Sequence, residues 1–293
     1  LYSVENENRE MIALEKYEVL APVGRYKEID IILREEPNAI YVGMKGVTSR
    51  PARTDFSTDE IKAATRLCHA KDIRIYVAVN SNIPDTSFER QIQSILELDA
   101  AGVDAFIVAD FGLISALAGK LKFAELHAST LLGVYNIETV RILKCYDVKR
   151  IIFYANMYLD EMVQIINAFP ELDYELVAEG GTCFNDIRQC RLPHFISENE
   201  HSLGCRNGCV LFGEDGLPQK GKILAEHPCR VAEIVGLYMA AGIHSFKIEG
   251  RTVPAAKRVS HIRDLKENIR KFENDQPLNS FLHYIARLRR EVL

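Results

Sequence analysis

The sequence has no apolar run long enough to cross a membrane and no excess of basic residues. A membrane-spanning helix needs roughly 18 or more consecutive apolar residues. The chain has 36 Lys and Arg against 41 Asp and Glu, a net charge of −5. Surfaces that grip nucleic acid non-specifically need a basic excess. We therefore expect no membrane span and do not favour nucleic acid as the partner, although a local basic groove is compatible with this composition.

A secretory leader is also missing, and the cysteine count does not suit a disulfide framework. No charged-then-apolar segment opens the sequence, and the seven cysteines are an odd number. A chain of 293 residues is long enough to bury a hydrophobic core without the help of disulfide bonds. We therefore expect a cytoplasmic, globular protein whose cysteines serve another purpose.

Short β-branched apolar runs alternate with stretches of helical period, a pattern typical of βα units and a parallel sheet. The runs are Tyr17–Ala21, Ala39–Val42, Ile73–Val79, Ala105–Val108, Phe123–Leu126, Ile151–Tyr154, Tyr174–Ala178 and Ser245–Ile248. No G-x-G-x-x-G turn follows the first run, so an open dinucleotide-binding sheet is disfavoured. We predict one domain over residues 1–293, an α/β fold of the (β/α)8 TIM-like barrel type. A long loop at about 179–228 follows the seventh strand, and a helical tail covers about 256–293.

The long loop carries the most informative pattern, four cysteines within 27 residues. Cys183, Cys190, Cys205 and Cys209 have the spacing C-x6-C-x14-C-x3-C. Wide, uneven spacing suits an iron–sulfur cluster. Zinc is the alternative metal, but structural zinc sites favour paired C-x2-4-C knuckles. The remaining interpretation is that these cysteines form disulfides or are unrelated buried thiols. We interpret Cys68 and Cys145 as packing residues on inward helix faces.

Active sites of this fold lie on the loops that follow the strands, so the cysteine loop is predicted at the catalytic mouth. Polar residues also lie at other expected strand ends: Asn80, Asp110, His127, Lys247, Glu249 and Arg251. Each has a structural alternative. Asp110 suits a helix N-cap, and Lys247 with Glu249 suits an ion pair that closes the barrel.

Four stretches together resemble the peptidase U32 family of collagenase-like proteins, which also includes proteins of the UbiU and UbiV type. The segment at 18–24 (EVLAPVG) is similar to the family's opening E-L-L-A-P-A-G, and 38–43 (NAIYVG) to its D-A-V-Y-L-G. The segment at 127–136 (HASTLLGVYN) is similar to its fifth-strand region, and 245–251 (SFKIEGR) to its S-x-K-I-E-G-R. The cysteines follow the family's order.

This resemblance implies a [4Fe-4S] cluster on the cysteine loop and oxygen-independent hydroxylation of a ring or nucleobase, with prephenate as a possible oxygen source. The chain departs from the family before its first two cluster cysteines, where Gly181-Thr182 and Arg188-Gln189 stand. Glu179 is therefore a candidate acid or base in their place. Cys229 is a reserve fourth ligand, because some relatives use a late cysteine.

We therefore expect an iron–sulfur hydroxylase of an aromatic or other small-molecule intermediate. Its catalytic candidates are Glu179, His127, Lys247 and Glu249, and its substrate contacts are Asn80 and Arg251. The alternatives are an RNA-base hydroxylase and a non-catalytic subunit that pairs with a paralogue or another copy. A peptidase is disfavoured, since neither a cysteine–histidine pair nor an H-E-x-x-H helix can be placed. The basic tail from Asn279 to Leu293 suits RNA or, more commonly, a docking helix.

Overall fold

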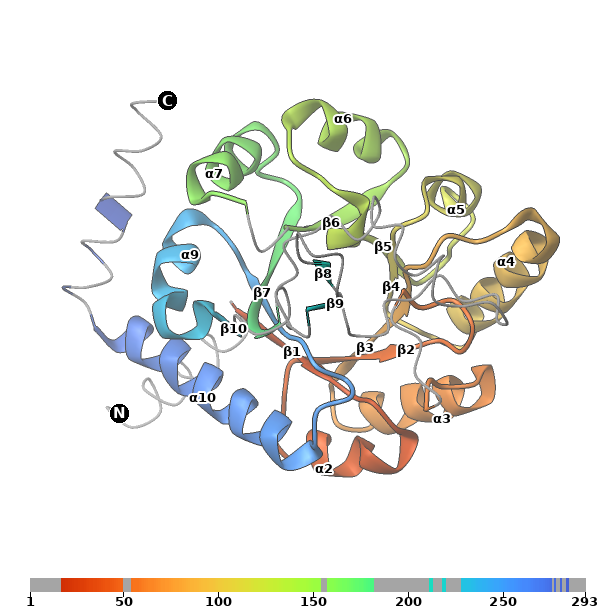
Figure 1. Ribbon diagram of the computed structural model, residues 1–293, viewed down its shortest axis with the longest axis horizontal. Coiled ribbons are helices and arrows are strands. Elements are labelled where there is room, and N and C mark those ends of the chain that lie inside the picture. Colours follow the sequence, from red (N-terminus) through yellow and green to blue (C-terminus); the bar gives the residue numbers. More distant parts are fainter. Residues whose placement is uncertain are drawn as a thin grey trace, which may run out of the picture.

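Eight parallel strands close into a barrel in the computed structural model (Figure 1). The structure describes residues 17–49, 54–153, 157–181, 211–212, 218–219, 228–275, 277, 280 and 283–284. The barrel strands follow chain order, and β6 pairs with β7 to complete the ring. They are β1 (Glu18–Pro22), β2 (Ala39–Gly43), β3 (Arg74–Val79), β4 (Ala105–Val108), β5 (Glu125–Ala128), β6 (Val148–Ile152), β7 (Asp173–Gly181) and β11 (Ser245–Ile248).

A helix follows each barrel strand, and the helices form the outer ring (Figure 1). They are α2 (Ile29–Leu33), α3 (Thr58–His69), α4 (Asp85–Ala100), α5 (Phe111–Leu117), α6 (Ile137–Cys145), α7 (Leu159–Ala168), α9 (Val235–Ala241) and α10 (Ala255–Asn274). The predicted (β/α)8 barrel is thereby confirmed. In the described part of the chain, no helix combines the length and apolar character that membrane crossing requires.

Short 3-10 turns and additional strands complete the described elements. The turns are η1 (Tyr26–Glu28), η2 (Thr130–Leu132) and η3 (Val231–Ile234). The strands β8 (Leu211–Phe212) and β9 (Pro218–Gln219) pair with each other, and β10 (Pro228–Arg230) pairs antiparallel with β7. In the view of Figure 1, β8 and β9 appear within the outline of the ring of barrel strands.

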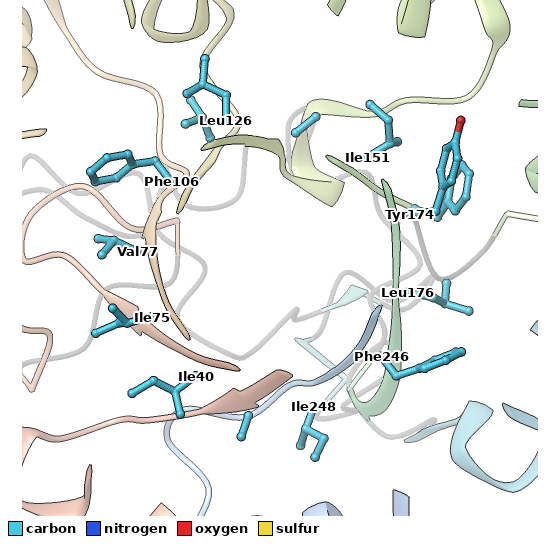
Figure 2. Packing of buried hydrophobic residues seen from close by; sticks show 14 of the residues in the cluster. Ile40, Ile75, Val77, Phe106, Leu126, Ile151, Tyr174, Leu176, Phe246 and Ile248 are labelled. Atoms are coloured by element: carbon cyan, nitrogen blue, oxygen red, sulfur yellow. The ribbon is translucent and has the colours of Figure 1, made fainter. Parts of the chain in front are cut away.

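The hydrophobic core lies mainly between the strands and the helices. Alternate strand residues such as Ile40, Val77, Phe106 and Ile248 are buried there and point away from the barrel axis (Figure 2). Successive side chains of a strand point to opposite faces, so their neighbours point into the barrel. The interior apolar cluster is smaller and comprises Leu20, Ala39, Tyr41, Tyr76, Ala105, Ile107 and Ile152. Charged residues fill much of the remaining interior.

The fifth strand begins two residues later than the predicted run at Phe123–Leu126. The carboxylate of Asp99, on α4, accepts hydrogen bonds from the backbone N–H groups of residues 122, 123 and 124, at 2.9, 3.0 and 2.7 Å. These donors are therefore not available to a strand ladder, and β5 starts at Glu125. His127 is consequently the second-last residue of β5, near the predicted strand end but within the strand.

The two helical cysteines have different environments. Cys68 on α3 is buried, as predicted. Cys145, the last residue of α6, is exposed, so the prediction of an inward packing role is wrong for it. Its thiol donates to the carbonyl of Arg141, 3.4 Å away, one turn earlier. The apolar residues of α6 that reach the core are Val140 and Leu143, which lie on another face of the helix.

Candidate functional site

The two residues that flank the cysteine segment, defined here as residues 182–227, lie at the carboxyl end of β7. Gly181, the last residue before the segment, pairs with Pro228, the first residue after it. The next pair in the same antiparallel ladder joins Gly180 and Cys229. Cys183, Cys190, Cys205 and Cys209 themselves lie outside the described residues. Their segment nevertheless leaves and rejoins the barrel at the end where active sites of this fold lie.

The barrel interior contains a charge network, which we define as Glu18, Arg74, Arg150, Asp173, Glu175, Ser245 and Tyr76; Arg74, at its edge, is exposed. Arg150 is its centre. One guanidinium nitrogen, Nη1, lies 2.6 Å from Glu18 Oε1 and 3.1 Å from Glu175 Oε2. Its Nη2 lies 2.5 Å from Asp173 Oδ2. A buried guanidinium needs such partners because transferring an unpaired charge from water is costly.

Glu18 is the most strongly perturbed carboxyl group of this network. Burial alone would raise its pKa, but the charges of Arg150 and Arg74 and the hydrogen bonds from Arg150 and Tyr76 lower it to about 2. The Tyr76 hydroxyl donates to Glu18 Oε2 at 2.6 Å. In Arg150, burial favours the neutral form, yet the carboxylates around it raise its pKa above the ordinary value. Both groups are therefore charged at neutral pH.

Lys247 lies on β11, two residues after Ser245, and contacts the network from the side nearer the carboxyl ends of the strands. Its Nζ is 3.3 Å from Glu175 Oε1 and 4.3 Å from the centre of the Tyr41 ring. The Lys247 side chain is 12% exposed, whereas Glu175 is fully buried. Ile248, the next residue, packs toward the helices, as predicted from strand alternation. The ion pair of Lys247 is made with Glu175, not with the predicted partner Glu249.

His127 is buried in the barrel interior as a neutral imidazole. Burial lowers its pKa well below the ordinary value, and the positive charge of Arg150 lowers it further. Its Nε2 lies 3.1 Å from Glu125 Oε2, and its ring packs edge-on against Tyr76, with ring centres 4.9 Å apart. Within the described part of the chain, its Nδ1 has no hydrogen-bond partner. This atom is therefore free to contact a group inside the barrel.

Glu179 and Glu249 are neighbours at the carboxyl end of the barrel. The backbone N–H of Glu249 donates to the carbonyl of Glu179 at 2.7 Å, and both side chains are half-buried. Gly180, the β7 residue that pairs with Cys229 of β10, has a φ of +145°. A side chain at Gly180 would overlap the Glu249 side chain, so glycine is needed for this close approach. Glu179 lies within β7, two residues before its end.

Arg251 links two loops at the carboxyl ends of the barrel strands. It follows β11, and its Nη1 donates to Asp55 Oδ1, in the loop between β2 and α3, at 2.5 Å. Asp55 is buried and also accepts from the Thr48 hydroxyl at 2.8 Å. The predicted substrate contact Arg251 therefore has at least this structural role.

Asn80 and Asp110 each support a loop backbone at the strand ends. Asn80 follows β3 and accepts from the backbone N–H of Ser49 through Oδ1, at 3.2 Å. Asp110 follows β4 and caps α5 by accepting from the N–H of Leu113, at 3.0 Å. Its second oxygen accepts from the N–H of Ile83, at 3.1 Å. The N-cap interpretation of Asp110 is thus confirmed.

Sequence reasoning located Lys247 and missed the carboxylate that holds it. The overlooked interior residues are Glu18, Arg150 and Glu175, and the overlooked rim residue is Asp55. A signal was present, because charged residues within apolar strand runs are seldom buried without partners. The structure brings Lys247 close to Glu175, and Glu179 close to Glu249. It places Asn80 and Arg251 in loop contacts.

A family model described as peptidase family U32 matches residues 24–291. The chain belongs to peptidase family U32. Among its U32-type relatives, it is 26% identical over 198 residues to tRNA hydroxylation protein P of Escherichia coli (strain K12), covering 66% of this chain and 43% of that protein. It is 25% identical over 240 residues to the 23S rRNA 5-hydroxycytidine synthase of the same organism, covering 80% and 35%. The chain thus spans less than half the length of these two relatives.

A solved U32 peptidase structure shares the fold. It aligns with a TM-score of 0.54 and 12% sequence identity, covering 81% of this chain and 94% of that chain. At this identity the likeness supports the barrel architecture alone.

Proposed function

We propose that this chain is an oxygen-independent hydroxylase that binds a [4Fe-4S] cluster through Cys183, Cys190, Cys205 and Cys209. The observation that carries the proposal is the pairing of Gly181 with Pro228, which fixes both ends of the cysteine segment at the active-site end of the barrel. Two U32 relatives are named for hydroxylation, which supports a hydroxylase role.

The four thiols form a soft donor set that suits iron–sulfur chemistry. When bound, the cluster would supply redox chemistry beside the barrel opening. Cys229, whose backbone is paired with Gly180, is the reserve fourth ligand. Zinc on the same thiols is the competing metal, and iron analysis separates the two. The chain's own residues would hold and orient the substrate.

We infer that the substrate is an RNA base, because the names of both hydroxylation relatives refer to RNA. A small aromatic intermediate, our expectation from the sequence, is the second candidate. The net charge of −5 favours this second candidate, since RNA binding usually draws on a basic surface. Prephenate is the proposed oxygen donor for either substrate. A paralogous subunit or a second copy of this chain is the proposed protein partner.

Lys247, Glu249, Glu179 and His127 are the proposed catalytic residues, with Asn80 and Arg251 at the rim. Lys247 is a proton donor at the boundary between the charge network and the mouth. Glu179 and Glu249, whose backbones are hydrogen-bonded, are proposed to provide carboxylates for proton transfer. His127, held neutral by burial, could offer Nδ1 to a bound group.

The test is anaerobic purification followed by spectroscopy and product analysis. We expect broad visible absorption, about four iron atoms per chain and loss of both in air, since an accessible cluster is open to oxidation. Bulk tRNA or a panel of small aromatic compounds is then incubated with prephenate, and products are examined by mass spectrometry for one added oxygen. A colourless protein that contains zinc after anaerobic purification would overturn the cluster. Colour without any oxygenated product would favour the non-catalytic subunit, and cleavage of gelatin by the purified chain would favour a peptidase.

A further inference from the structure

Glu175 and Lys247 form an ion pair inside the barrel whose facing atoms lack hydrogen bonds. Glu175 Oε1 lies 3.3 Å from Lys247 Nζ, and no hydrogen-bond partner for this oxygen exists in the described part of the chain. Lys247 likewise makes no hydrogen bond to any residue that the structure describes. Buried polar groups are normally hydrogen-bonded. The ammonium therefore has donors left for a bound group.

The orientation of Glu175 is fixed from its other side. Its Oε2 is 3.1 Å from Arg150 Nη1 and accepts from the Ser245 hydroxyl at 3.5 Å. Oε1 is thereby held toward Lys247. The Tyr41 ring, 4.3 Å from Nζ, provides a second favourable contact for the ammonium. Glu175 and Tyr41 together define where the ammonium lies.

The rest of the network is electrically balanced without this pair. Two cations, Arg74 and Arg150, contact two carboxylates, Glu18 and Asp173. With Glu175, which contacts both Lys247 and Arg150, the three carboxylates balance the three cations. A buried ion pair is a weak source of stability, because desolvation offsets the attraction. Its presence at the mouth side of the network is better explained by binding.

The balanced charge also selects the kind of group that Lys247 can bind. A full carboxylate would add an uncompensated negative charge beside Glu175. A carbonyl oxygen accepts a hydrogen bond without adding charge, and Lys247 would stabilise any partial negative charge that develops on it.

We propose that Lys247 hydrogen-bonds a carbonyl oxygen of the substrate, and that Glu175 is the positioning residue that holds the ammonium for this contact. This inference rests on the proposed hydroxylase function, whose RNA-base substrates carry ring carbonyl groups. It assigns the carboxylate groups of prephenate to other residues.

A double-mutant cycle separates binding from structure. Glu175→Gln leaves Lys247 without its anionic partner, and Lys247→Met leaves Glu175 with only Arg150 and Ser245 as partners. Each change therefore lowers the melting temperature, and the double variant, in which the charges balance again, recovers part of it. All three variants are assayed as full chains, purified anaerobically, with bulk tRNA and prephenate. We expect at least tenfold lower kcat in all three, the double variant included. Recovery of activity together with stability in the double variant would mean that the pair is only structural.

A second measurement does not depend on turnover. Lys247 is carbamylated with cyanate, and the modified peptide is quantified by mass spectrometry. Glu175→Gln should increase modification several-fold, because the amine then lacks its ion-pair partner. Tyr76→Phe is the matched control, because it removes only the hydrogen bond to Glu18. It should leave the modification of Lys247 unchanged. Unchanged labelling in Glu175→Gln overturns the positioning role. Absence of product from the unaltered chain overturns the proposed function and the carbonyl ligand, while the labelling result still decides the role of Glu175.

Discussion

Arg251 occupies the space beside Gly43 that a side chain at that position would need. A methyl group at Gly43 would overlap the Arg251 guanidinium and approach Asp55 Oδ1. Gly24 is constrained in a similar way, because a methyl group there would overlap the carbonyl of Arg251. Gly43 ends β2, and Gly24 follows β1. Because neither has a side chain, Arg251 can cross both strand ends and reach Asp55.

Gly43→Ala should destabilise the protein by about 1–3 kcal/mol, the usual cost of forcing atoms into a packed site. Urea unfolding provides the measurement. In an Arg251→Ala background the same change should cost less, because the overlap with the guanidinium is removed and only the close approach to Asp55 remains. Equal costs in both backgrounds would show that Gly43 is constrained by something other than Arg251.

Replacing any of Cys183, Cys190 or Cys205 by Ala should remove visible absorption and lower iron content, if these thiols hold the cluster as proposed. Cys145→Ala is the matched control, because this exposed thiol lies on α6 and should leave iron unchanged. Cys209→Ala and Cys229→Ala identify the fourth ligand. Full iron in Cys209→Ala with loss in Cys229→Ala would reassign it.

Glu18 should make the protein sensitive to acid. Its pKa is about 2 in the folded chain against an ordinary 4.5, so the unfolded state binds the proton first as pH falls. The stabilisation, about 3 kcal/mol, is complete above pH 4.5 and is lost between that value and about 2. Glu18→Gln should be less stable at neutral pH and lose less stability over this interval. Urea unfolding across this pH series tests both expectations.

His127 should remain a neutral imidazole in mildly acidic solution. Its folded pKa is lowered by burial and by Arg150, so only the unfolded state gains a proton just below the ordinary value of 6.5. Stability should therefore be full above about 6.5 and decrease as pH falls. Nitrogen NMR of the imidazole reports its protonation, and the signal is assigned by its absence in His127→Gln. A protonated signal near pH 6 in the folded protein contradicts this prediction.

The two helical thiols should differ in reactivity. Burial, with a smaller effect of the Asp104 charge, raises the pKa of Cys68 to about 12, and a thiol reacts as its thiolate. Exposed Cys145 should be alkylated by iodoacetamide in the folded protein, while Cys68 should react only after unfolding. Peptide mass spectrometry distinguishes the sites. Equal labelling before unfolding would show that the α3 side of the core opens readily.

The barrel could be predicted because its outward strand residues are apolar and regularly spaced. Ala105–Val108 and Ser245–Ile248 have the predicted bounds, since these runs are bordered by polar or turn residues. The sixth strand was displaced in the prediction, which began at Ile151, whereas β6 begins at Val148. An apolar-run criterion excludes Arg150, although its partners allow it to be buried.

The interior charge network could not be predicted because its contacts join distant parts of the chain. Glu18 meets Arg150 from 132 positions away and Ser245 from 227 positions away. No local pattern records such a pairing. The same holds for Asp99, whose contacts with the backbone of residues 122–124 place the start of β5 at Glu125.

The pairing of Gly181 with Pro228 makes the cysteine segment an insertion whose two ends are already joined. The eight strands close through pairings that do not involve residues 182–227. Lengthening a loop between fixed ends adds only a slowly growing entropy cost. Mutation can therefore change the segment's length and sequence while the barrel keeps its shape. The stability of the barrel is thereby largely separated from the sequence of the segment that carries the cysteines.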